Sequence, residues 1–269
     1  MKISPLTLAF VVALVPASAF ATITDFNNWT LVEDPPNANM SASLDSASQV
    51  TLNATGPVPN ATDIGYQSVN GNTPATSTAG YAFDPTASFS IAVDYDWSFV
   101  NAVGGTGIGF GIGEDGAGEN SAGVAIAATD SAVGISAGTA RVNDTTLSSF
   151  PLIQFNASPT GSMHLSYDAN TGNITVGTGT VGGNAPTASA TLTGATVYGL
   201  WNADNNDDLL LVSVFLRSQG GFLPALTTGS TTAVFTDFRV TSGSAVNIPE
   251  PTSLTLLGIG GLLVSRRRR

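Results

Sequence analysis

The stretch Phe89–Phe99, with the sequence FSIAVDYDWSF, decides the fold. Six apolar side chains alternate in it with five small or acidic ones, so an apolar residue recurs at every second position. Successive side chains of a β-strand point to opposite faces of a sheet. The pattern therefore predicts a strand with one buried and one polar face.

Strand patterns recur on both sides of this stretch. Gly107–Gly113 places isoleucine and phenylalanine between glycines, which predicts a strand whose bare face is either closely covered by another backbone or approached by something else. Met163–Asp168 and Ile174–Val176 flank Ala169–Gly172, a link of ordinary hairpin length. Further strands are predicted at Trp29–Val32, Gln49–Leu52, Ile64–Val69, Val124–Ala127, Leu152–Phe155, Val197–Trp201, Leu209–Leu216 and Ala233–Val240.

The composition of residues 22–247 agrees with an all-β fold. This segment contains no lysine and few glutamates, while glycine, threonine, serine, valine and alanine dominate it. Such a composition favours strands joined by small-residue turns. With roughly a dozen strands and no amphipathic helix, we expect a single antiparallel β-sandwich of the jelly-roll type. The sequence leaves open whether Asp34–Ser48 belongs to the sandwich or is a linker.

Residues 1–21 have the form of a cleavable signal peptide. Lys2 precedes an apolar run from Leu6 to Val15, and small residues follow it. Two overlapping A-x-A patterns predict cleavage after Ala19 or Ala21. The alternative is a permanent N-terminal anchor, for which the apolar run is short.

The tail, residues 248–269, has three parts in a fixed order. The motif Pro249, Glu250 and Pro251 precedes the uncharged segment Thr252–Ser265, and the basic end follows, formed by Arg266, Arg267, Arg268 and Arg269. The 14 residues of the uncharged segment would cover about 21 Å as a helix, less than the roughly 30 Å of a bilayer core. Four arginines behind it favour a cytoplasmic end.

This order of motif, apolar stretch and basic cluster resembles the PEP-CTERM sorting signal of Gram-negative and related bacteria. The resemblance implies a short transmembrane helix in the inner membrane, recognition by an exosortase-type membrane protease, and cleavage near Pro249–Pro251. The protein would then be displayed in the cell envelope or released outside the cell. The alternative is a plain C-terminal anchor that is never cut.

The middle of the chain carries a second resemblance. Ser162–Thr180, SMHLSYDANTGNITVGTGT, resembles the hairpin of concanavalin-A-like lectin and glucanase domains, in which the pattern x-L-x-Y-D-x-x-T-G-x-L-x-V is common. Phe89–Gly113 and Ala233–Val240 are compatible with the same fold. The resemblance is one of pattern over most of residues 22–244, and it implies a concanavalin-A-like sandwich.

Charge and cysteine content exclude some classes of protein. Residues 22–247 contain 18 Asp and Glu against only Arg141, Arg217 and Arg239, a net charge of about −15. Such a surface repels phosphate backbones, so we expect no nucleic-acid partner. Cysteine is absent, so the core must stabilise the exported fold without disulfides, as a domain of this size is able to do.

Catalytic residues are hard to find in this sequence. Glucanases of the resembled fold carry acidic residues along one strand, because retaining hydrolysis needs two carboxyl groups about 5–5.5 Å apart. Asp94 and Asp96 are the nearest match, but no glutamate accompanies them, and we interpret them as part of the solvated polar face of the strand. The single histidine, His164, alternates outward on its hairpin and is expected at the surface. We therefore expect no enzyme, with a divergent glycan hydrolase or lyase as an alternative.

Two acidic clusters are candidates for calcium. Glu114 and Asp115 lie in a glycine-rich loop, and Asp204, Asp207 and Asp208 lie in a second turn. Calcium takes six to eight oxygen ligands, and a short loop is able to supply several. Neither cluster fits the EF-hand pattern. The alternative is a solvated turn, where Asp and Asn are common because they hydrogen-bond nearby backbone.

Two tryptophans are candidates for carbohydrate binding. Trp201 is followed directly by Asn202, and Trp29 follows two asparagines. The alternative for both is ordinary core packing. The sequence therefore predicts an exported, surface-sorted β-sandwich that is structural or associated with extracellular polysaccharide, without catalysis. A calcium-assisted, lectin-like carbohydrate-binding module is the first alternative.

Overall fold

Two large antiparallel sheets form the fold. The computed structural model describes residues 24–116, 118–143, 145–146, 158–194, 197–201, 209–218 and 223–248. The first sheet has the order β1 (Thr30–Asp34), β4 (Thr62–Gln67), β14 (Leu211–Ser218), β7 (Gly105–Gly113), β8 (Ser121–Thr129), β9 (Ala132–Val142) and β10 (Thr145–Thr146). The second has the order β13 (Ala188–Leu192), β12 (Asn173–Gly179), β11 (Thr160–Asp168), β6 (Phe89–Val103), β15 (Thr228–Ser242), β3 (Gln49–Thr55) and β2 (Met40–Ser46).

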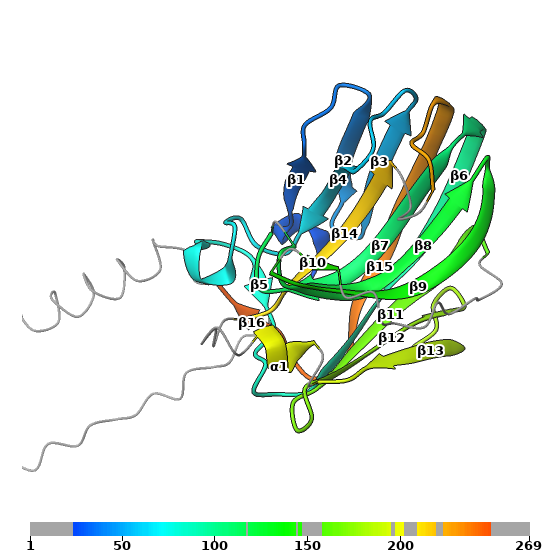
Figure 1. The fold of residues 1–269 in the computed structure, drawn as a ribbon. Helices are drawn as coiled ribbons and strands as arrows, with labels where there is room; N and C mark the ends of the chain where they lie inside the picture. Colours follow the sequence, from blue (N-terminus) through cyan, green and yellow to red (C-terminus); the bar gives the residue numbers. More distant parts are fainter. Residues whose placement is uncertain are drawn as a thin grey trace, which may run out of the picture.

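Small elements complete the sandwich. A two-stranded sheet pairs β16 (Val246–Asn247) with β5 (Tyr81–Ala82). The helical elements in the described ranges are α1 (Tyr198–Trp201) and the 3₁₀ turns η1 (Phe26–Asn28) and η2 (Pro74–Thr76). Figure 1 shows the two large sheets lying one over the other, with β5, β16 and α1 near one end. The predicted all-β antiparallel sandwich is therefore confirmed.

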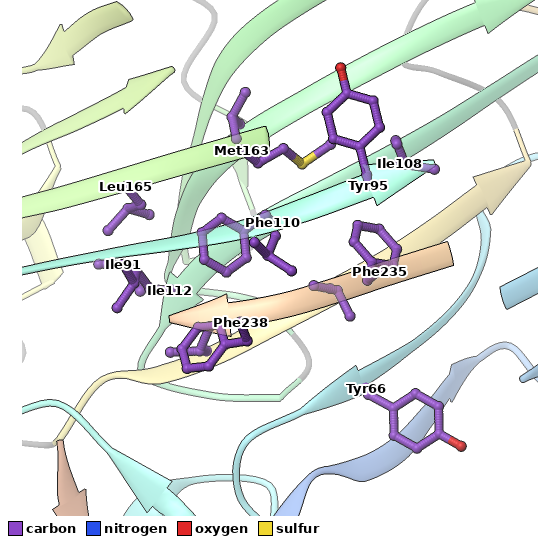
Figure 2. Packing of buried hydrophobic residues seen from close by; sticks show 14 of the residues in the cluster. Tyr66, Ile91, Tyr95, Ile108, Phe110, Ile112, Met163, Leu165, Phe235 and Phe238 are labelled. Carbon is purple, nitrogen blue, oxygen red and sulfur yellow. The ribbon is translucent and has the colours of Figure 1, made fainter. Parts of the chain in front are cut away.

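The core lies between the two large sheets. In β6 the apolar residues of the alternating stretch are buried from Phe89 to Trp97, as their period of two predicts. Figure 2 shows the layer that results, with Ile108 and Phe110 from the first sheet close to Tyr95 and Met163 from the second. The residues that alternate with these core residues along each strand point to the outer faces of the two sheets.

The predicted hairpin is also confirmed. Strands β11 and β12 are antiparallel, and their register pairs Leu165 with Val176 and Tyr167 with Ile174. Asp168 begins the turn, where its side chain accepts hydrogen bonds from the backbone N–H and the side-chain amide of Asn170. These bonds explain why the chain reverses at this point.

Two segments differ from or extend the sequence prediction. The region Asp34–Ser48 is part of the sandwich, because β2 is an edge strand of the second sheet. The prediction of a strand at Val197–Trp201 is wrong, since the segment forms α1, in which the N–H of Trp201 donates to the carbonyl of Val197. An apolar run this short does not distinguish a buried strand from a buried turn of helix. Leu152–Phe155 lies outside the described residues.

The predicted signal peptide and sorting tail fall outside the described residues, including Ala19, Ala21 and Pro249–Arg269. Within the described part of the chain, no helix is both long and apolar enough to cross a membrane.

Candidate functional site

The glycine-rich strand β7 packs closely on its bare face. All nine residues of β7 are buried. Gly109 lies beneath the ring of Phe215 from β14, and a Cβ atom there would lie 2.2 Å from the ring. At Gly105 a Cβ atom would lie 2.3 Å from the Cβ of Leu223. Of the two alternatives that the glycine pattern left open, close coverage is therefore the one that the structure shows at these positions.

An ion pair lies on the outer face of the first sheet, beside this strand. Nε of Arg217 on β14 lies 3.1 Å from Oδ1 of Asp63 on β4, and both side chains are about one-third exposed, at 35% and 29%. Burial raises the pKa of Asp63 to about 6, with a smaller contribution from Asp34 opposite it on β1, while Arg217 and Arg141 act in the other direction. The two paired atoms are buried although their side chains are partly exposed, so the pair is intermediate between a surface ion pair and a core one.

The loop that was a calcium candidate uses its carboxylates internally. Both carboxylate oxygens of Asp115 accept backbone N–H groups, from Glu119 at 2.9 Å and from Asn120 at 3.0 Å. Glu114 is buried and accepts the side-chain amide of Asn120 at 3.0 Å. In the described ranges, no three His, Cys, Asp or Glu side chains gather as a metal site would require. These hydrogen bonds match the alternative interpretation of the loop, a turn whose acidic and amide side chains bond to nearby groups of the same loop. The second candidate, with Asp204, Asp207 and Asp208, lies outside the described residues.

Both candidate tryptophans are core residues. Trp201 is fully buried, and its Nε1–H donates to the carbonyl oxygen of Arg141 at 2.8 Å. Trp29 is 5% exposed, and its Nε1–H donates to the Tyr81 hydroxyl at 2.6 Å. Neither ring is therefore available as an exposed stacking surface for a sugar, and the core-packing alternative applies to both. Asn202 lies outside the described residues.

The outer face of the second sheet carries a buried ion pair that the sequence did not reveal. Asp94 on β6 was expected in solvent, but it is 5% exposed. Nη1 of Arg239 on β15 donates to Asp94 Oδ1 at 3.0 Å, and the N–H of Gly182 donates to Oδ2 at 2.8 Å. Arg239 also donates to the carbonyl of Gly183 and, at 3.1 Å, to the exposed carboxylate of Asp237. The backbone that follows β12 therefore covers this part of the sheet.

The same covering segment corrects the expected position of His164. The imidazole is 4% exposed, and its Nε2 lies 2.7 Å from the Ser162 hydroxyl. Ser162 donates its own proton to the carbonyl of Thr180 at 2.9 Å, so the hydrogen between the two side chains belongs to His164. Burial lowers the pKa of His164 to about 4, with a further contribution from Arg239, while Asp94 acts in the opposite direction. A histidine that donates to the serine is not placed to act as its base.

Next to this cluster, the outer face of the second sheet presents rows of hydroxyl and amide groups. One row crosses four adjacent strands, because the registers place its members directly opposite one another. We call it the polar row, and it consists of Ser41, Asn53, Thr232 and Ser98. Its members are exposed or half-buried. Thr232 Oγ1 donates to Asn53 Oδ1 at 2.7 Å.

A second row runs parallel to the polar row, two residues along each strand. Its strand pairs join Ser43 to Thr51 and Val234 to Asp96 across the same four strands. The carboxylate of Asp45 accepts hydrogen bonds from Ser43 at 2.7 Å, from Thr51 at 2.5 Å and from Gln49 at 3.0 Å. Adjacent strands lie about 4.8 Å apart, so the two rows form a regular array of donors and acceptors.

Comparison with a protein-family model identifies the tail. Residues 247–269 match the model described as the PEP-CTERM protein-sorting motif. The match includes Pro249–Pro251 and the whole of the basic end. The chain therefore carries a sorting signal of exported proteins at its C-terminus. A search among curated proteins found none that matches the chain.

Comparison with solved structures returns other β-sandwiches at low sequence identity. The β-glucanase of Bacillus licheniformis is 12% identical, with a TM-score of 0.49, over 81% of this chain and 96% of that one. A legume lectin-like domain from Entamoeba histolytica is 8% identical, with a TM-score of 0.46, over 83% and 98%. An alginate lyase is 12% identical, with a TM-score of 0.43, over 81% and 96%. At these values the likeness extends to the type of fold alone.

Proposed function

We propose that this chain is a surface-displayed, non-catalytic β-sandwich that associates with extracellular polysaccharide through the outer face of its second sheet. The observation that carries the proposal is the polar row and the row parallel to it. Serine, threonine and asparagine side chains donate and accept hydrogen bonds, as sugar hydroxyls do. An array of such groups across four adjacent strands suits a long, repetitive and hydrated partner, with bridging water contributing to the contact.

Charge supports a neutral or weakly charged polysaccharide as the partner. The only cation among residues 22–247 that the structure places on this face is Arg239, and it is already paired with Asp94. The exposed carboxylates Asp45 and Asp96 would repel an acidic glycan. Sorting by the tail would bring the face to the compartment where such a polymer lies, after cleavage by an exosortase-type protease.

The contacts of Asp94, Ser162 and His164, which lie next to the polar row, favour binding over catalysis. Asp94 is paired with Arg239 and covered by backbone, whereas its neighbour on the strand face, Asp96, is exposed in the second row. His164 and Ser162 lie beneath the segment that follows β12. A glycan hydrolase needs two carboxyl groups that reach one glycosidic bond, whereas Asp94, His164 and Ser162 are engaged in structural contacts and only the carboxylate of Asp96 is exposed among them.

Retention on polysaccharide tests the proposal. The processed protein is passed over immobilised extracellular polysaccharide from its own host and over a panel of neutral glucans. The double variant Thr51→Val and Thr232→Val removes one hydroxyl from each row. At about 1 kcal/mol for each lost hydrogen bond, we expect binding to weaken roughly 30-fold.

Thr139→Val is the matched control, because Thr139 is an exposed residue on β9, on the outer face of the other sheet. It should leave retention unchanged. Equal retention of the double variant and the parent protein would exclude this face as the binding surface. Release of reducing sugars or of unsaturated products from any polymer would instead favour a hydrolase or a lyase.

A further inference from the structure

The last described residues form part of the sandwich. We call residues 243–248 the closing segment; it follows β15 of the second sheet and crosses to the end of the first. Its strand β16 pairs with β5, and the N–H of Ile248 donates to the carbonyl of Gly80 at 2.9 Å. The Ile248 side chain is 9% exposed and belongs to a small buried cluster with Val69, Ala82 and Leu211.

The sorting motif begins at the next residue. Only Pro249, Glu250 and Pro251 separate Ile248 from the apolar segment that starts at Thr252. A fully extended chain spans at most about 3.6 Å per residue, so the four steps from Ile248 to Thr252 cover at most about 14 Å. With the apolar segment in a bilayer, the closing segment has no long linker that would let the sandwich move away.

We propose that, before processing, the end of the sandwich formed by the closing segment, β5 and the start of β6 faces the phospholipid bilayer at a distance of about 14 Å or less. The inference rests on the membrane-anchored form of the proposed function. Strand β6 shows how the rest of the sandwich is oriented relative to the bilayer. Ser90 pairs with Ser242, where the closing segment begins, and Val100 lies ten residues further, about 33 Å along the strand. The Val100 end therefore points away from the membrane.

The membrane-facing end is acidic. Its own charge therefore does not attract it to the bilayer, and it is the anchored tail that keeps it close. Asp168 lies there because the next residue, Ala169, donates its N–H to the Ser88 hydroxyl just before β6. The loop with Asp115 and Glu119 lies there because the N–H of Gly116 donates to the carbonyl of Asn72, in the segment before β5. Carboxylates close to an anionic surface are repelled. Cleavage of the tail therefore favours departure of this end from the membrane.

Fluorescence quenching in vesicles tests this orientation. The chain has no cysteine, so Ala87→Cys and Val100→Cys each give a single labelling site, both exposed and at opposite ends of β6. The full chain is reconstituted into phosphatidylcholine vesicles that carry a nitroxide on the lipid headgroup, and flotation first verifies that the tail has inserted. We expect quenching several times stronger at position 87 than at position 100.

A length variant shows whether the tail imposes the orientation. Twelve Gly and Ser residues inserted between Ile248 and Pro249 form a flexible linker with an end-to-end distance of about 20 Å. The difference between the two labels should then largely disappear. Equal quenching in the parent chain, or stronger quenching at position 100, would overturn the inference, as would a difference that survives the insertion. A chain that does not float refutes the anchored form itself, and the inference with it.

Discussion

Replacing Asp94 by asparagine should lower the free energy of unfolding by about 2 kcal/mol at pH 7. The Asp94 side chain is 6% exposed and that of its partner Arg239 is 15% exposed, so the pair is largely removed from water. Removing one partner of a buried ion pair usually costs 3–5 kcal/mol because the other charge is left uncompensated. Here Arg239 keeps a second carboxylate, that of the exposed Asp237, 3.1 Å away. We take a value below this range because of that second carboxylate, and because asparagine keeps an oxygen that is able to accept the N–H of Gly182.

Urea unfolding followed by tryptophan fluorescence measures the loss, and the chain supplies its own control. Asp63 and Arg217 are separated by a similar distance, 3.1 Å, but both side chains are about one-third exposed. Asp63→Asn should therefore change the stability by less than about 1 kcal/mol. Since burial raises the pKa of Asp63 to about 6, ionisation is disfavoured in the fold, and a small gain is also consistent.

A double variant isolates the interaction between the two buried charges. Asp94→Asn combined with Arg239→Leu should cost less than the sum of the two single changes, because each single change already removes the contact between the two charges. Additive losses would show that the pair does not interact. Equal losses for Asp94→Asn and Asp63→Asn would contradict the reasoning from burial.

Three further predictions concern other parts of the sandwich. The pKa of His164 is about 6.5 in the unfolded chain and about 4 in the fold, so its contribution to stability is complete above pH 6.5 and is lost as the pH falls towards 4. His164→Gln should therefore reduce the loss of stability between pH 7 and pH 4 in urea unfolding curves. An unchanged loss would contradict the assignment. A processed chain that ends at Ser244 should be about 2 kcal/mol less stable to urea than one that ends at Ile248, because it lacks β16 and the buried isoleucine; equal midpoints would show that the closing segment contributes nothing. Gly109→Ala should lower stability by about 1–3 kcal/mol through collision with the Phe215 ring, and Phe215→Ala in the same chain should make the glycine change nearly neutral, as thermal unfolding of the four chains would show.

Local periodicity explains how much of the fold was predictable. The alternation in Phe89–Phe99 corresponds to β6, and Met163–Val176 corresponds to the hairpin of β11 and β12. These patterns depend on neighbours along the chain, which the sequence displays directly. Val197–Trp201 failed for the opposite reason, because a run of five residues with several apolar side chains packs equally well as a turn of helix.

Non-local packing explains what remained out of reach. His164 and Asp94 occupy polar positions on their strands, and alternation alone assigns them to solvent. They are buried because the backbone after β12, with Gly182 and Gly183, lies over them. The polar row exists because β15 inserts between β6 and β3, and no local pattern encodes that order or its register.

The tryptophans show how the same residue type supports two interpretations. Trp29 and Trp201 follow or precede asparagine in the sequence, which made them candidates for sugar binding, yet both donate their indole N–H to partners inside the protein. A large aromatic residue contributes so much to a core that burial is its commoner use. The face that we propose for binding is instead made of small polar side chains, which form no recognisable motif in a sequence.

The intact mass of the mature protein from its native host is the most direct test of the account, measured with and without the exosortase-type protease. The account predicts an N-terminus at Phe20 or Thr22 and a C-terminus close to Pro249, with the longer tail present only when the protease is missing. A mass from cells that contain the protease, but that still includes Arg266–Arg269, would contradict sorting by cleavage and would mean that the tail is a simple anchor.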